Sequence, residues 1–235
     1  MRILALEQST TCAGVALMAD GEIVAEREWS ETRRRNQQLF EEIPRLLAEA
    51  KHGLDEIDIF ATGLGPGSFT SLRIAVTAAR AYALPRQTPV IGIASDAALS
   101  LAVHKQTGSA RVTVIGDARR ERIWIARYAI EGGRPVLQEE RSMLPCAEFT
   151  PDEKRDGMIA TPDWVRLQPV LEALDGDVLL ITETRSPRAR DIARLALDHG
   201  IPSEPDTPLT PIYLHPPVFV EPRFPATGAP SQEQS

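Results

Sequence analysis

The dipeptide Asp20–Gly21 constrains the fold of this chain more than any other local feature. It joins two short apolar or alternating runs, residues 12–19 and 22–29, and Asp-Gly between such runs is the strongest short signal for a β-hairpin. A third run of the same kind, residues 2–8, comes before them. The chain is therefore expected to begin with three successive strands, at least two of them antiparallel.

Helices and strands alternate in the next part of the chain. Apolar side chains at three- and four-residue spacing predict a helix over residues 36–51. An antiparallel start followed by alternating helices and strands favours a mixed sheet that is covered by helices. The further elements expected here are strands at 57–65 and 89–95 and helices at 68–84 and 95–104.

The second half of the chain repeats this order in part. Strands are expected at 111–119, 122–130, 134–144 and 177–182, and helices at 164–174 and 186–200.

Two similar halves of this order are typical of the actin-like, ribonuclease-H-like superfamily of nucleotide-binding α/β folds. We therefore expect two similar lobes, each a mixed sheet covered by helices, at residues 1–104 and 105–214. Residues 215–235 form a Pro-rich tail whose end is expected to be disordered.

Composition narrows the function classes. The net charge of −7 and a pI near 5.2 argue against autonomous binding of nucleic acid, which depends on clustered Lys and Arg. No apolar run approaches the roughly 20 residues of a membrane helix, and we expect a cytoplasmic protein. Cys12 and Cys146 are far apart and outside any CxxC pattern, so neither a disulfide framework nor a zinc site is indicated.

The glycine-rich loop GLGPGSFTSLR, residues 63–73, raises the question of phosphate binding. Gly65 and Gly67 supply the backbone freedom that a strand-to-helix reversal needs, and Ser68 is a favourable N-cap for the following helix. No GK[ST] follows, so this is not a Walker motif. Thr70 stands where a GxSxG nucleophile elbow needs glycine. We expect Arg73 to make a polar contact at the base of the helix.

Four blocks, in order along the chain, resemble the TsaB family, also called YeaZ: ILALEQSTTCAGVAL, GLGPGSFTSLR, DARRERIWIARY and PIYL. The family is related to TsaD and to glycoprotease-like proteins of actin fold. The resemblance implies a non-catalytic dimerisation subunit of the machinery that threonylcarbamoylates adenosine 37 of tRNA. Its partners would be the transferase TsaD and the ATPase TsaE, and homodimers are expected without TsaD. ATP, a metal ion and tRNA would be held by the complex rather than by this chain alone.

The resemblance also implies a docking surface on the first two helices. TsaB-like proteins dimerise through these helices, and the second one carries small residues at helical spacing, which allow close helix approach. The residues expected at or near this contact are Leu39, Ile43, Leu72, Val76, Ala79 and Arg80.

The sequence departs from the family pattern at five positions, which leaves open whether partner choice has changed. The departures are Glu7, where the family has Asp, Ser71, where it has Gly, and Asn36, Arg122 and His215.

The alternative to a non-catalytic subunit is an enzyme, namely an autonomous actin-like ATPase or kinase. Glu7 with Ser9, Thr10 and Thr11 would then face phosphates from the first lobe and Asp117 from the second. The competing interpretation is that the hydroxyl residues bond their own turn backbone and that Asp117 pairs with Arg119.

A metalloprotease-like enzyme has weaker support. Two histidines four residues apart on one helix can share a metal ion, but none of the histidines here has another within five residues. They are His52, His104, His199 and His215.

Overall fold

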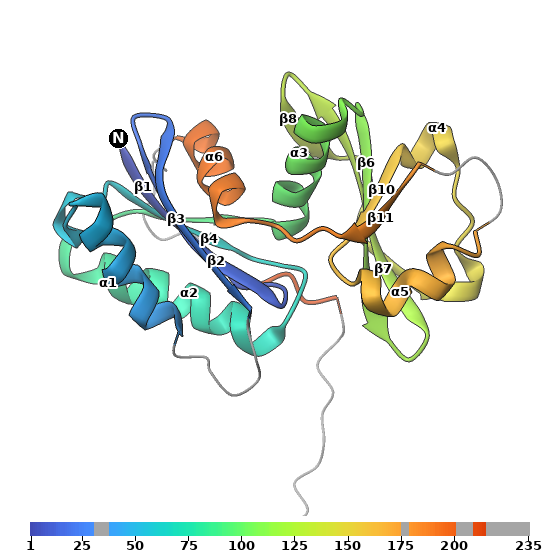
Figure 1. The fold of residues 1–235 in the computed structure, drawn as a ribbon, viewed down its shortest axis with the longest axis horizontal. Coiled ribbons are helices and arrows are strands. Elements are labelled where there is room, and N and C mark those ends of the chain that lie inside the picture. Colours follow the sequence, from blue (N-terminus) through green and yellow to red (C-terminus); the bar gives the residue numbers. More distant parts are fainter. Residues whose placement is uncertain (31–37, 175–178, 201–208, 215–235) are drawn as a thin grey trace, which may run out of the picture.

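The computed structural model describes residues 1–30, 38–174, 179–200 and 209–214. Figure 1 shows two sheets side by side, each covered by helices. The first sheet has the order β3-β2-β1-β4-β5; β1 to β3 are antiparallel neighbours, whereas β1, β4 and β5 run parallel. Its strands are β1 (Arg2–Glu7), β2 (Cys12–Ala19), β3 (Glu22–Ser30), β4 (Ile59–Gly63) and β5 (Val90–Ile93).

The hairpin expected at Asp20–Gly21 is confirmed. Both residues have positive φ, 51° at Asp20 and 87° at Gly21. This is the pattern of the two-residue turns whose twist matches that of paired strands. The turn joins β2 to β3 and brings Ala19 opposite Glu22.

The second sheet repeats the topology of the first. Its order is β11-β10-β6-β7-β8, with β6, β7 and β8 antiparallel and β10 and β11 parallel to β6. This repeat confirms two similar actin-like lobes. The strands are β6 (Arg111–Arg119), β7 (Arg122–Glu131), β8 (Arg134–Leu137), β10 (Met158–Thr161) and β11 (Leu180–Thr184).

Two features of the second lobe differ from the sequence-based expectation. The single strand expected at 134–144 is two short strands, β8 and β9 (Ser142–Pro145), which both pair with β7. Strand β10 was not expected, because its residues neither alternate between apolar and polar types nor form an all-apolar run. It follows a short helix, α4 (Glu153–Asp156).

The outer faces of the sheets are covered by separate helices. Helices α1 (Gln38–Ala50) and α2 (Phe69–Ala83) lie on one face of the first sheet, and α5 (Trp164–Leu171) lies on the second (Figure 1). The matching expectations are confirmed to within a few residues at each end. Among the described residues, no helix has the length and apolar character needed to cross a membrane.

The remaining helices, α3 (Ser95–Thr107) and α6 (Ala189–His199), lie between the two sheets (Figure 1). Helix α6 follows the last strand of the second sheet, yet Ile192 packs against Ile3 and Met18 of the first. Helix α3 follows the first sheet, yet Leu99 packs in the core of the second. The last helix of each half therefore packs on the sheet of the other.

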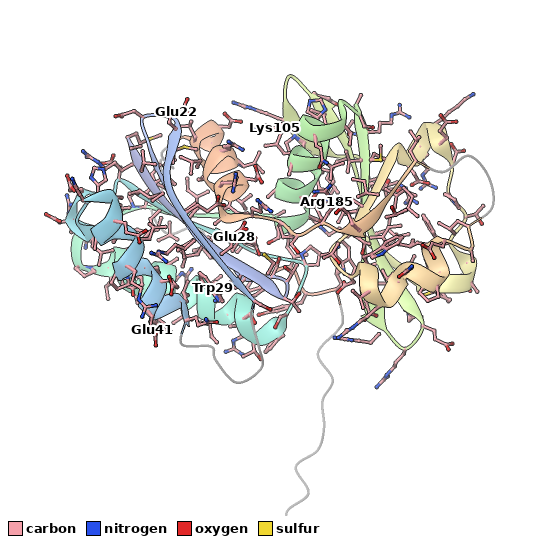
Figure 2. The ribbon with its side chains drawn as sticks, viewed as in Figure 1. Glu22, Glu28, Trp29, Glu41, Lys105 and Arg185 are labelled. Atoms are coloured by element: carbon pink, nitrogen blue, oxygen red, sulfur yellow. The ribbon has the colours of Figure 1, made fainter. Side chains whose placement is uncertain are left out.

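This exchange changes the expected division of the chain. The sheets fall on either side of residue 104, but α6, within the range expected for the second lobe, completes the core of the first. An ion pair supports this position, because Arg188, just before α6, lies 3.3 Å from Glu28 of β3. Glu28 is labelled in Figure 2 close to the beginning of α6.

Removing apolar volume from α6 should destabilise the first lobe. Ile192 is 0% exposed, and Ile192→Ala should lower the free energy of unfolding by about 2–5 kcal/mol because it leaves a cavity. Urea denaturation measures the loss. Val165→Ala is the control, since Val165 on α5 is 83% exposed and its truncation should cost less than about 0.5 kcal/mol. Equal effects of the two substitutions would contradict the position of α6.

Candidate functional site

A buried carboxylate lies at the end of β1. Glu7 is 0% exposed; its Oε1 accepts the N–H of Ser9 at 2.6 Å, and its Oε2 accepts the hydroxyl of Ser95 at 2.7 Å. Burial raises the pKa of the Glu7 carboxyl, against the lowering effect of the hydrogen bonds from Ser9 and Ser95. Both carboxylate oxygens are therefore engaged inside the first lobe.

The loop before α2 lies directly against the turn between β1 and β2. The N–H of Ser68 donates to the carbonyl of Ser9 at 2.8 Å, and a Cβ at Gly67 would lie only 2.1 Å from that same oxygen. Gly65 has a φ of 89°, and its N–H donates to Ser95 Oγ at 3.0 Å. Glycine is required at position 67 because the Ser9 backbone lies too close for a Cβ, and at position 65 because φ is positive there.

Ser68 is the N-cap of α2, as expected. Its Oγ accepts the N–H of Ser71 at 3.5 Å and lies 2.9 Å from the Ser71 hydroxyl. The departure from the family pattern at Ser71 therefore adds a second hydroxyl to the cap. Arg73 makes no polar contact of the expected kind with another described residue; its guanidinium lies over the ring of Phe69, 5.3 Å from the ring centre.

The first-lobe residues that could have faced a nucleotide phosphate bond instead to nearby backbone groups. Thr10 Oγ1 bonds to the backbone of Cys12, accepting its N–H at 3.2 Å and donating to its carbonyl at 3.1 Å. Ser9 is 2% exposed, and its backbone is bonded to Glu7 and Ser68. The loop before α2 packs on Ser9, while Thr10 is half-buried and Thr11 is exposed at the tip of the turn.

Asp117 in the second lobe is also occupied by neighbours. Its carboxylate lies 3.0 Å from both Arg119 and Arg166, and its N–H donates to Asp163 at 2.9 Å. The ion pair with Arg119 is the one that the sequence analysis gave as the alternative to phosphate binding by Asp117. Arg122, a departure from the family pattern, donates to the carbonyl of Met143 at 3.1 Å.

The remaining positions of interest are dispersed. His104 lies in the last turn of α3 and His199 ends α6, as expected, while His52 is 3.0 Å from Glu56. Within the described ranges, no three His, Cys, Asp or Glu residues gather in a way that could hold a metal ion. Asn36 and His215 lie outside the described residues.

Most of the expected docking residues are buried in the chain itself. Val76 is 7% exposed, and the others apart from Arg80 have no exposed surface. Leu39, Ile43 and Ala79 belong to the core between these helices and the sheet. A partner can reach them only if the lobe opens, so we move the expected contact to their exposed neighbours. The fully buried ones are Leu39, Ile43, Leu72 and Ala79.

An exposed stripe does run along α2. Phe69, Arg73, Arg80 and Leu84 follow each other at intervals of four, seven and four residues, which places them on one side of the helix. Phe69 is 54% and Leu84 76% exposed, and both arginines are exposed. Tyr213 extends the stripe, since its ring centre lies 4.9 Å from that of Phe69. We call these five residues the α2 stripe; Thr70 is exposed beside it.

Comparison with known proteins identifies the family. The family model TsaD, described as tRNA N6-adenosine threonylcarbamoyltransferase, matches residues 22–148. A relative from Escherichia coli (strain K12), named tRNA threonylcarbamoyladenosine biosynthesis protein TsaB, is 33% identical over 83% of this chain and 86% of its own length. The chain belongs to the TsaB family.

Other members of the TsaB family agree in sequence and fold. The Haemophilus influenzae TsaB is 30% identical over 59% of this chain and 58% of its own length. The solved structure of YeaZ from Pseudomonas aeruginosa superposes with a TM-score of 0.76 at 27% identity. It covers 91% of this chain and 99% of that one. The two-lobe arrangement is therefore shared with a TsaB relative along nearly the whole chain.

The buried Glu7 carboxyl should make stability depend on pH. Its folded pKa is above the ordinary value of 4.5, so the folded chain keeps this proton to a higher pH than the unfolded chain. The free energy of unfolding should therefore fall as pH rises from 4.5 through the folded pKa. Glu7→Gln should remove this loss, because the amide can still accept from Ser9 and bond to Ser95. Urea denaturation across this pH window tests the difference between the two proteins.

Glu139→Gln provides a control of opposite sign. Hydrogen bonds from Arg127 and Arg155 lower the pKa of Glu139, so this carboxylate stabilises the fold above its unfolded pKa and loses that effect in acid. Parallel pH profiles for the wild type and Glu7→Gln would contradict the role assigned to Glu7.

Proposed function

We propose that this chain is a non-catalytic subunit for threonylcarbamoylation of adenosine 37 in tRNA. It would act in the cytoplasm by docking onto a TsaD-type transferase and activating it together with the ATPase TsaE. Two copies would pair through the same surface when the transferase is absent. The tRNA, the ATP and any metal ion would be bound by the other subunits.

The internal bonding of Glu7 and Ser9 at the first turn carries this proposal. A nucleotide held between actin-like lobes needs access to the first hairpin turn. In this chain, Ser68 donates to Ser9 there and Gly67 leaves no room for even a methyl group. Glu7, the acidic candidate, is buried with both oxygens bonded. These contacts support a structural rather than a catalytic use of the turn.

The α2 stripe supports docking. Helix α2 contains no carboxylate, although the chain has a net charge of −7, so Arg73 and Arg80 form a local basic surface. Exposed aromatic and apolar groups flank them at Phe69, Tyr213 and Leu84. Aromatic residues and arginine are the residue types enriched at the centres of protein interfaces. The expected partner surface is an apolar helix face with carboxylates beside it.

Charge reversal in the stripe should weaken docking without unfolding the chain. Arg80→Glu should raise the Kd for TsaD at least tenfold, a cost of about 1.4 kcal/mol, because a carboxylate would then face the partner's acidic groups. Capture of TsaD by tagged chain measures the loss. Threonylcarbamoylation by TsaD, TsaE, the adenylate-forming enzyme and tRNA should fall in parallel. Val165→Glu, on the exposed side of α5, is the control.

Undiminished capture by Arg80→Glu would place the interface elsewhere. Modification of tRNA that is equally fast with and without the wild-type chain would refute the proposed function itself. Val76 is not suitable for this test, because a charge at a side chain only 7% exposed would disturb the fold first.

Nucleotide binding separates this proposal from an autonomous ATPase or kinase. Titration of the isolated chain with ATP and magnesium should show no binding tighter than about 100 μM, which corresponds to roughly 5.5 kcal/mol, because Glu7 and the Ser9 backbone are already bonded inside the first lobe. Calorimetry detects such binding readily. Saturable binding in that range would favour the enzymatic alternative.

A further inference from the structure

Two consecutive residues at the start of α3 reach into opposite lobes. Ser95 is 1% and Asp96 2% exposed. Ser95 Oγ donates to Glu7 at 2.7 Å and accepts the N–H of Gly65 at 3.0 Å, while the Ser95 N–H donates to the Gly65 carbonyl at 2.8 Å. Ser95 is thus bonded to β1 and to the beginning of the loop that leads into α2.

Asp96 is bonded to the second lobe. Arg141, in the connection between β8 and β9, donates from Nε to Oδ2 at 2.7 Å and from a terminal nitrogen to Oδ1 at 2.9 Å. The same guanidinium donates to the hydroxyl of Tyr128 on β7 at 3.0 Å. The Arg141 side chain is 16% exposed and that of Asp96 0%. A bidentate pair fixes the relative orientation as well as the separation of its two groups.

Packing around α3 reinforces both connections. Ala98 and Leu101 face the core of the first lobe, and Leu99 and Val103 face that of the second. Rotation of one lobe relative to the other would have to break the bonds of Ser95 or those of Asp96, and would move one of these apolar faces. The backbone between the two residues offers no flexible segment that could absorb the rotation.

We propose that Ser95 and Asp96 form an inter-lobe clamp that fixes the angle between the two lobes and ties it to the loop preceding α2. The clamp holds the second lobe in one position relative to the α2 stripe, with or without ATP. It is a property of the isolated chain, and it does not rest on the proposed function.

Distance distributions between the lobes test the clamp. Spin labels are attached at Ala48→Cys on exposed α1 and at Val165→Cys on α5, in a chain whose native Cys12 and Cys146 are replaced by Ser. Pulsed dipolar spectroscopy should give a narrow distribution that ATP and magnesium do not shift. Arg141→Ala should broaden it about twofold or more, because the bidentate pair is lost.

Arg134→Ala is the matched control. It breaks another ion pair between the lobes, Arg134 with Asp198, which is 3.8 Å long and has side chains 63% and 43% exposed. Its distribution should stay as narrow as that of the wild type. If Arg141→Ala shows no cooperative thermal transition, Asp96→Asn provides the second variant and should broaden the distribution to an intermediate width.

The clamp is overturned by a distribution that stays narrow in folded Arg141→Ala or Asp96→Asn. It is equally overturned by a broad distribution in the wild type. Binding of TsaD does not enter the measurement, so these outcomes leave the proposed function untouched.

Discussion

The burial of the Glu7 carboxyl is the constraint around which the first lobe is arranged. A carboxyl removed from water must be hydrogen bonded by its surroundings, and here Ser9 and Ser95 supply the donors. Room for it requires glycine in the neighbouring strand, since a Cβ at Gly63 would lie 2.0 Å from its Oε2. The end of β1, the end of β4 and the start of α3 therefore have to meet at this group.

The same constraint argues against phosphate binding by the glycine-rich loop. Phosphate-binding loops direct free backbone N–H groups toward the ligand. In this loop the N–H groups of Gly65 and Ser68 already donate to Ser95 and Ser9. This loop has the composition of an anion-binding loop, but its N–H groups connect β4 and α2 to the rest of the first lobe. It fixes where α2 begins and therefore which residues that helix exposes.

Local sequence signals predicted the elements of the fold well. Asp20–Gly21 identified the first hairpin, Ser68 identified the start of α2, and the repeat of strands and helices identified two lobes. Strand β10 was missed because Met158–Thr161 neither alternates between apolar and polar residues nor forms an all-apolar run. The packing of α6 on the first sheet was missed because its apolar stripe shows that it is half-buried, but not against which sheet.

The site was less predictable because its contacts join distant parts of the chain. Ser95 meets Glu7 across 88 positions and Asp96 meets Arg141 across 45, and no local pattern specifies such pairs. Small residues on α2 correctly indicated close packing, but Ala79 and Leu72 pack inside the chain. The exposed stripe is recognisable only when the register of the helix against its own sheet is known.

The exchange of α3 and α6 also sets an order for folding during synthesis. The first sheet can form once β5 has been made, but its inner face, with Ile3 and Met18, stays uncovered until Ala189 and the rest of α6 follow. At synthesis rates of about 5–20 residues per second, that interval is roughly five to twenty seconds. Throughout it the ribosome carries a half-covered sheet, which is a natural substrate for chaperones. Each lobe therefore needs a helix from the other half of the chain to complete its core.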